Sequence, residues 1–333
     1  HIFPKHKLGR VLYNSWEATE FDVHVESQKE LAKKAAQIGV ELFVIDDGWF
    51  GERHNDRAGL GDWYVNKEKF PNGLSELIDY VKQLGMDFGI WVEPEAVNPD
   101  SDLYRAHPDW IYRFKNQEPV QMRNQYTLNI SKKEVKEFIL AFMTDLLSKH
   151  KDITFIKWDM NKPLTDVSMG NTAQDKELWY KHAQALYEIW GILRKKFPYV
   201  DFEVCSGGGA RIDLGILRYA DQCWPSDNTD AYERLFIQEG FSYFYAPRIM
   251  TAWVTDASSN NPKKYERPYN YRFYSSMMGV LGIGADISKL SDEVLKEFKK
   301  YISLYKEIRE TVQYGKQYRL SSVRESPLHA VEY

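Results

Sequence analysis

Cysteine is scarce in this 333-residue chain, which contains only Cys205 and Cys223. Two cysteines exclude a disulfide framework, and although one bridge is possible, we expect both to be free thiols. The eight histidines are dispersed, and the CxxC and HExxH spacings typical of zinc sites are absent. The sequence therefore predicts neither a metal site nor another cofactor.

Long apolar runs and an excess of basic charge are also lacking. No apolar run approaches the 18 residues of a membrane-spanning helix, and the first ten residues contain no apolar signal segment. We therefore predict a cytoplasmic protein without a membrane partner. The sequence on which this prediction rests begins with His1 rather than Met. The formal net charge is −4 and Lys and Arg are scattered, which argues against a nucleic-acid partner and favours a neutral ligand.

The chain does contain a repeated alternation of short apolar runs and helical patterns. Runs of four to seven apolar residues without strict alternation are typical of parallel strands that are buried on both faces. Helices are expected after most of them, including two that begin at capping boxes at Ser27 and Ser131, one at residues 208–218, and a last one capped by Ser291. The eight predicted strands are residues 11–16, 41–47, 86–92, 153–158, 200–205, 219–224, 248–254 and 280–285.

Such strands could form either a closed (β/α)8 barrel or an open doubly wound sheet. Polar and aromatic residues follow nearly every strand, which favours the barrel because a barrel gathers all eight carboxyl ends on one face. An open sheet would gather them mainly where its strand order reverses. We predict an α/β fold, a TIM barrel, over residues 9–314, with an N-terminal extension at 1–8 and a tail at 315–333 that resembles the start of a β-domain.

Two aspartates at strand ends are the strongest candidates for chemistry. Alternation along a strand places Lys157, Asp159 and Asn161 on one side, and burying such a charged pair is costly without a function. Asp227 follows a later strand, although Ser226-Asp227-Asn228 is also a typical turn sequence. Two carboxylates on one rim are what hydrolysis of a sugar bond requires.

A second acidic pair, Asp46-Asp47, ends the second strand. These acids could accept hydrogen bonds from vicinal hydroxyl groups or bind magnesium. Magnesium would imply a phosphate partner, but the glycine cluster at residues 205–210 matches no phosphate-binding motif. Tryptophans at strand ends, such as Trp16 and Trp91, serve either core packing or the binding of a sugar ring.

The chain resembles the α-galactosidases of glycoside hydrolase family 36 in seven ordered segments. The resemblance implies a retaining α-galactosidase that acts on terminal α-linked galactose, as in raffinose or melibiose, with Asp159 as the nucleophile and Asp227 as the general acid/base. The segments are residues 13–18, 45–51, 70–74, 89–95, 157–161, 205–209 and 224–230. The resemblance also implies that the sugar is bound by Trp16, Asp46, Asp47, Trp91, Arg123, Lys157, Asn161, Cys205 and Gly208.

Bacterial members of that family usually carry β-domains on both sides of the barrel and often form tetramers. We expect these flanking domains to be missing or truncated here, and a homo-oligomer is expected only by analogy with full-length relatives. Two alternatives stay open. The first is an α-N-acetylgalactosaminidase, in which space beside Cys205 and the glycines would admit the 2-acetamido group of the sugar. The second is a catalytically weak barrel that binds galactose but lacks the geometry to hydrolyse it.

Overall fold

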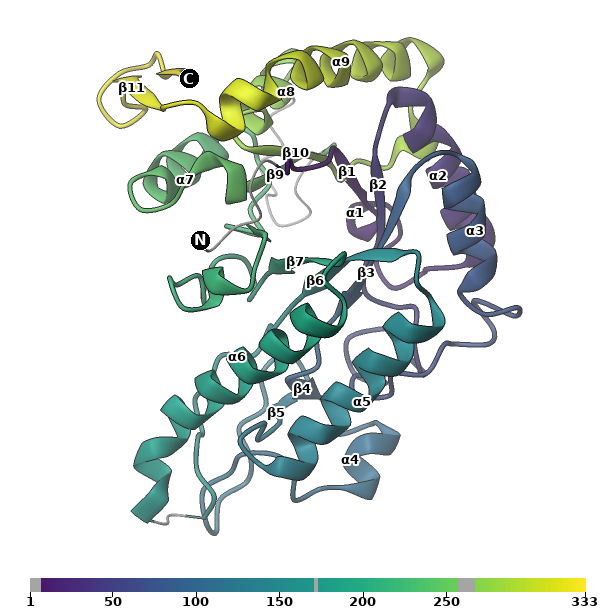
Figure 1. Ribbon diagram of the computed structural model, residues 1–333, viewed down its shortest axis with the longest axis vertical. Helices are drawn as coiled ribbons and strands as arrows, with labels where there is room; N and C mark the ends of the chain where they lie inside the picture. Colours follow the sequence, from purple (N-terminus) through teal and green to yellow (C-terminus); the bar gives the residue numbers. More distant parts are fainter. Residues whose placement is uncertain (1–6, 171–172, 257–266) are drawn as a thin grey trace.

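Eight parallel strands form the central sheet in the computed structural model, which describes residues 7–170, 173–256 and 267–333. Their order is β8-β7-β6-β3-β2-β1-β10-β9. An isolated parallel bridge between Cys223 and Met250 brings the two edge strands together. The sheet is therefore a nearly closed barrel, and the predicted (β/α)8 fold is confirmed (Figure 1).

Each strand of the barrel overlaps one of the predicted runs. The main difference is at the first run, because the strand ends at Asn14 and Trp16 already begins the short helix α1 (Trp16–Thr19). The strands are β1 (Leu12–Asn14), β2 (Leu42–Ile45), β3 (Asp87–Val92), β6 (Ile153–Trp158), β7 (Asp201–Val204), β8 (Gln222–Cys223), β9 (Thr251–Val254) and β10 (Val280–Ile283).

Seven longer helices surround the strands in the described part of the chain (Figure 1). Gly39 ends the first of them with φ 97°, and the Ser291 hydroxyl caps the last by accepting from the backbone N–H of Val294. None of the described helices combines the length and the apolar character needed to cross a bilayer. These helices are α2 (Val25–Ile38), α3 (Ser75–Gln83), α5 (Lys133–Lys149), α6 (Leu178–Lys196), α7 (Glu233–Ser242), α8 (Tyr269–Ser276) and α9 (Asp292–Tyr314).

Smaller elements lie in the loops and after the barrel. The loop after β3 carries β4 (Ala96–Val97), α4 (Asp102–Ala106) and β5 (Tyr126–Thr127), and β4 pairs with β5. After α9, strands β11 (Tyr318–Ser321) and β12 (Ala330–Glu332) form a separate antiparallel pair. The boundaries predicted at residues 8 and 314 stay predictions, although α9 does end at Tyr314.

The predicted helix starts at Ser27 and Ser131 are wrong. Helix α2 begins two residues before Ser27, whose hydroxyl donates to the carbonyl of His24, and the Ser131 hydroxyl donates to the side chain of Asn129. Ser27 lies inside the first turn of α2, and Lys132 precedes α5, so neither serine occupies the capping position.

The predicted helix at residues 208–218 is also wrong. Only the 3-10 turn η2 (Ile216–Arg218) forms there. Gly207 and Gly208 adopt φ 50° and 98°, left-handed values that interrupt a right-handed helix. The backbone N–H of Ser206 donates to the carbonyl of Gly208, so the chain makes a tight turn after β7 instead.

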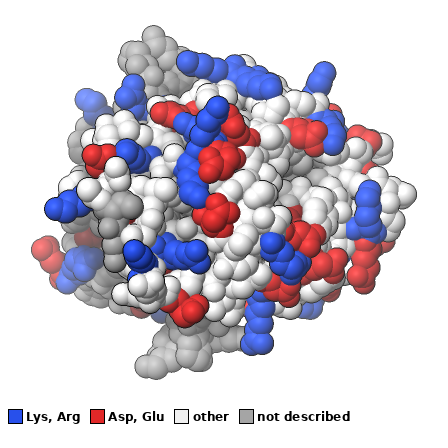
Figure 2. Space-filling model, turned by 90° about the horizontal axis from the view of Figure 1, so that it is seen from below, with Lys and Arg blue, Asp and Glu red and all other residues white. Residues whose placement is uncertain are grey.

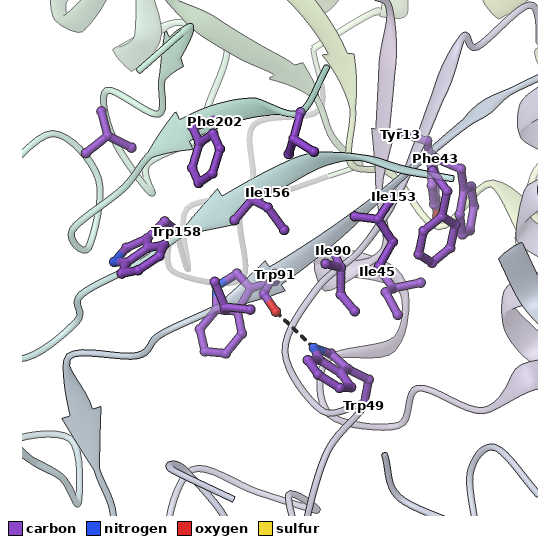
Figure 3. Packing of buried hydrophobic residues seen from close by; sticks show 14 of the residues in the cluster. Tyr13, Phe43, Ile45, Trp49, Ile90, Trp91, Ile153, Ile156, Trp158 and Phe202 are labelled. Atoms are coloured by element: carbon purple, nitrogen blue, oxygen red, sulfur yellow. Dashed lines mark hydrogen bonds between the residues drawn. The ribbon is translucent and has the colours of Figure 1, made fainter. Parts of the chain in front are cut away.

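The two faces of the strands carry different side chains. On β6, Ile156 and Trp158 point outward and pack with the helices, whereas Phe155 and Lys157 point into the barrel. Figure 3 shows part of the larger buried cluster, in which the indole N–H of Trp49 donates to the carbonyl of Trp91 at 2.9 Å. Inside the barrel, Leu42, Val44 and Phe155 belong to a small apolar layer. Charged residues follow this layer toward the carboxyl ends of the strands.

Glu95 joins the end of β3 to the neighbouring elements. Its fully buried carboxylate accepts from the indole of Trp158 at 2.8 Å, pairs with Arg211, and lies 3.0 Å from Nε2 of His182 on α6. Burial alone would raise the pKa of Glu95, but the charges and hydrogen bonds of Arg211 and His182 lower it to about 2. This carboxylate therefore stays ionised and stabilises the fold.

We predict that Glu95→Gln lowers the free energy of unfolding at pH 7 by about 3 kcal/mol, the value of a pKa displaced from 4.5 to about 2. Because the folded pKa is depressed, this contribution is complete above pH 4.5 and is lost as the pH falls toward 2. Urea titrations at pH 7 and at pH 3 should show the difference shrinking. Glu177→Gln, which removes an exposed ion pair with Lys181, should have little effect at either pH.

Candidate active site

A pocket of about 350 Å³ lies at the carboxyl ends of the barrel strands. Nine of the eleven predicted site residues line it, and they come from six separate segments of the chain. The pocket is large enough for one sugar ring and is mostly polar. Its lining residues are Trp16, Glu17, Glu20, Asp46, Asp47, Trp91, Arg123, Lys157, Asp159, Asn161, Trp224, Asp227, Thr229 and Trp253.

Asp159 lies directly after β6 and is almost fully buried. Its backbone N–H donates to the carbonyl of Val92, and its carboxylate accepts from the indole of Trp91 at 3.2 Å and from the N–H of Met160 at 2.8 Å. Burial raises the pKa of Asp159, but the charge of Lys157 and these and other hydrogen bonds outweigh burial and lower it. Asp159 is therefore held as a buried carboxylate.

Lys157 provides the positive charge at the bottom of the pocket. Its ammonium lies 2.8 Å from the carboxylate of Asp46, which also accepts from the side chain of Asn14 at 2.7 Å. The ammonium is 4.7 Å from the ring centroid of Trp253. Burial would lower the pKa of Lys157, but the nearby Asp46 carboxylate raises it overall, so the lysine stays charged.

Asp47 is fixed by an arginine that the sequence analysis did not single out. Nε and Nη2 of Arg53 donate to the two carboxylate oxygens of Asp47 at 2.9 and 2.8 Å, and Nη1 donates to Asn98 at 2.9 Å. Arg53 is buried and lies in the same loop as the acidic pair, so a search for cations near Asp46-Asp47 could have found it. Both acids are already paired with a cation, which does not favour the magnesium alternative.

Asp227 projects from the loop after β8. The indole N–H of Trp224 donates to its carboxylate at 2.8 Å. Burial and the negative charge of Asp159 raise the pKa of Asp227, in the opposite direction to that of Asp159. The turn hydrogen bonds at this point are made by Ser226 and Asn228, not by Asp227, which leaves its carboxylate for the pocket.

Arg123 and Asn161 also line the pocket, but Cys205 and Gly208 do not. Cys205 is a buried free thiol whose pKa is raised by burial and by the charge of Asp159. Gly208 lies against the Asp227 loop, since a Cβ there would come within 2.8 Å of the Cα of Ser226. The structure thus places both residues in the wall behind the carboxylates, and their contact with the sugar stays a prediction.

Five lining residues, Glu17, Glu20, Trp224, Thr229 and Trp253, were not among the predicted site residues. Trp253 stacks on Trp224 with ring centroids 4.0 Å apart, and because it lies near the carboxyl end of β9, the strand-end argument could have found it. Burial and the charge of Glu20 raise the pKa of Glu17 to about 7. Thr229 has no comparable sequence signal.

The described residues, with 1–6, 171–172 and 257–266 left aside, contain no group of three His, Cys, Asp or Glu side chains arranged to hold a metal ion. Acidic and basic side chains are interspersed on the face shown in Figure 2, in keeping with the small formal net charge of −4. The pocket itself is acidic, with six carboxylates and two basic side chains.

Comparison with known proteins agrees with this arrangement. The family model described as melibiase matches residues 3–315. The chain belongs to the melibiase family. The resemblance to glycoside hydrolase family 36 is thereby confirmed, since the crystal structure of the GH36 α-galactosidase AgaA from Geobacillus stearothermophilus superposes with a TM-score of 0.94 at 41% identity.

This melibiase domain is similar to part of several longer proteins. It is 42% identical to α-galactosidase Mel36A of Lactobacillus acidophilus over 96% of the chain and 43% of that protein. In the sequence comparison, the identity to AgaA is 42% over 94% of this chain and 43% of AgaA. The superposition on the AgaA crystal structure covers 98% of this chain and 45% of the AgaA chain. The chain thus spans less than half the length of these relatives.

The hydrogen bond from Trp224 to Asp227 gives a testable prediction for this melibiase pocket. Trp224→Phe should raise the pKa of Asp227 further, because the lost indole donor stabilises the charged carboxylate. Carboxyl chemical shifts of 13C-labelled aspartate, followed against pH, would measure the change. Trp253→Phe is the control, as Trp253 shares the stack but its indole N–H contacts no described acceptor. Equal shifts in both variants would contradict the assigned role of Trp224.

Proposed function

We propose that this chain forms the catalytic barrel of a retaining α-galactosidase that hydrolyses terminal α-linked galactose from oligosaccharides of the raffinose and melibiose type. The observation that carries the proposal is the pairing of Asp159 and Asp227 in one pocket with pKa values displaced in opposite directions. The names of the relatives support it, and crystal structures of AgaA variants are described as complexes with stachyose and with raffinose.

The reaction proceeds in two displacements. The ionised Asp159 attacks the anomeric carbon while protonated Asp227 gives its proton to the departing glycosidic oxygen, leaving a β-galactosyl ester on Asp159. Asp227 then takes a proton from water, whose oxygen attacks the same carbon and releases galactose with retained configuration. We expect a separation of roughly 5–5.5 Å between the two carboxyl groups, as in retaining enzymes generally.

The remaining pocket side chains suit a neutral sugar. Asp46 and Asp47, held by Lys157 and Arg53, present acceptor oxygens in fixed positions to vicinal hydroxyl groups. The ammonium of Lys157 can also donate to a hydroxyl group. Trp91 holds Asp159 from one side and gives the wall an apolar surface.

A test on p-nitrophenyl α-D-galactoside and its N-acetylgalactosamine analogue distinguishes the candidate functions. An α-galactosidase hydrolyses the first, an α-N-acetylgalactosaminidase the second, and a binding barrel neither. We predict that Asp159→Ala abolishes turnover of the galactoside and that added azide restores it, with β-galactosyl azide as the product. An α-configured azide would refute the assignment of Asp159 as the nucleophile.

The raised pKa of Asp227 predicts how activity depends on pH. Asp227 must be protonated in the first step, so kcat/KM should fall as the pH rises through its pKa, and Asp227→Asn should remove this alkaline limb. Asp227→Ala should reduce kcat/KM on raffinose by about 10²- to 10⁴-fold but largely spare the release of p-nitrophenol, which needs no protonation. Unchanged hydrolysis of raffinose would rule out the acid role.

Two further expectations stay predictions. A cytoplasmic location rests on the sequence features given above, and assembly into a homo-oligomer rests on analogy with full-length members of the family. Sedimentation of the full-length protein would measure its oligomeric state.

A further inference from the structure

Glu93 is a buried carboxylate that lies next to the pocket without lining it. It follows β3 directly, and its side chain is 1% exposed. The chain turns at Pro94 and Glu95, and the carboxylates of Glu93 and Glu95 meet different partners. Glu95 meets the side chains of Arg211 and His182, whereas the hydrogen bonds of Glu93 all come from amide groups.

The first partner of Glu93 is Asn161, which lines the pocket two residues after Asp159. One carboxylate oxygen of Glu93 accepts from the backbone N–H of Asn161, and the other accepts from its side-chain Nδ2 at 3.0 Å. The side-chain oxygen of Asn161 in turn accepts from the N–H of Gly207 at 3.1 Å. Both ends of the Asn161 amide are therefore fixed, and its orientation depends on Glu93.

The second partner is Gln125, whose side chain donates to Glu93 at 2.7 Å. Gln125 is buried and closes a tight turn with Met122 through two backbone hydrogen bonds of 3.3 and 3.1 Å. Within this turn, Arg123 and Asn124 have φ 52° and 59°, left-handed values that side-chain-bearing residues adopt only when the surroundings hold them. The turn places Arg123 in the pocket lining.

We propose that Glu93 is a positioning residue that ties Asn161 and the Arg123 turn together, so that two walls of the galactose pocket keep one relative geometry. This inference rests on the proposed function. A carboxylate suits this task because its two oxygens can accept three donors from two loops at once. Burying a carboxylate here costs free energy that burying an apolar side chain would not cost. This cost argues that the site depends on the hydrogen bonds that Glu93 accepts.

The environment of Glu93 supports this assignment. Burial and the negative charge of Asp159 raise the pKa of Glu93 to about 7. Glu93 thus lies close enough to Asp159 for their charges to interact. A displacement at Glu93 is therefore transmitted to the nucleophile side of the pocket through Asn161 and to the opposite wall through Arg123.

The test is a double-mutant cycle on hydrolysis of p-nitrophenyl α-D-galactoside. Glu93→Gln keeps the size of the side chain but turns one acceptor into a donor that faces another donor, so kcat/KM should fall by about 10- to 100-fold and Ki for galactose should rise. In an Asn161→Ala background, and likewise in an Arg123→Ala background, Glu93→Gln should lower kcat/KM by a several-fold smaller factor.

Asp62→Asn is the matched control. Asp62 is also a buried carboxylate, but it accepts from backbone N–H groups of Asp102 and Leu103 at 3.0 Å each, neither of which lines the pocket. This variant should lower Tm to a similar extent and leave Ki for galactose within about twofold. A loss that is equal in all backgrounds would mean that Glu93 only stabilises the fold, and would overturn the inference.

A second variant keeps the inference testable if Glu93→Gln does not fold. Gln125→Met removes only the bond to the turn, so its effect should be non-additive with Arg123→Ala and additive with Asn161→Ala. Additivity with both would overturn the inference. A wild-type chain that binds galactose without turnover would refute the catalytic proposal alone, and the cycle would then be measured on galactose affinity. A chain that does neither would refute both.

Discussion

The pocket depends on one buried ion pair, between the ammonium of Lys157 and the carboxylate of Asp46, 2.8 Å apart inside the barrel. Several carboxylates share this space, and carboxylates that lie close together raise one another's pKa. The positive charge of Lys157 opposes that effect at Asp159, whose pKa is lowered in spite of burial. The acidic pocket can therefore keep Asp159 ionised, because Lys157 lies near the end of the strand that this aspartate follows.

The pKa values of Asp159 and Asp227 are displaced in opposite directions because the two carboxylates have different surroundings. Asp159 is adjacent to Lys157 and accepts several hydrogen bonds, whereas Asp227 lies on a loop where burial and the charge of Asp159 prevail. Arg53 and Glu93 do not line the pocket, but they hold side chains that do, Asp47 and Asn161. The geometry of the site is thus set by a layer of buried polar groups behind the pocket.

Much of the fold and the centre of the site could be predicted from the sequence. Apolar runs marked the eight strands, and residues at their carboxyl ends, including Trp91 and Asp159, do line one pocket. Helix starts were less predictable, because α2 begins before Ser27 and α5 begins after Lys132, so neither Ser27 nor Ser131 occupies the capping position. The helix expected at residues 208–218 failed because Gly207 and Gly208 adopt left-handed backbone angles that a count of apolar residues does not reveal.

The sequence by itself predicted that Lys157, Asp159 and Asn161 lie together at the end of β6, by extending the alternation of side chains along the strand to the residues that follow it. It could not determine the partners that come from distant segments. Lys157 at Asp46, Trp91 at Asp159, and Gln125 at Glu93 meet only when the barrel closes and its loops fold over one rim. Those contacts fix the charge and orientation of the carboxylates, since burial and hydrogen bonding are properties of the folded chain alone.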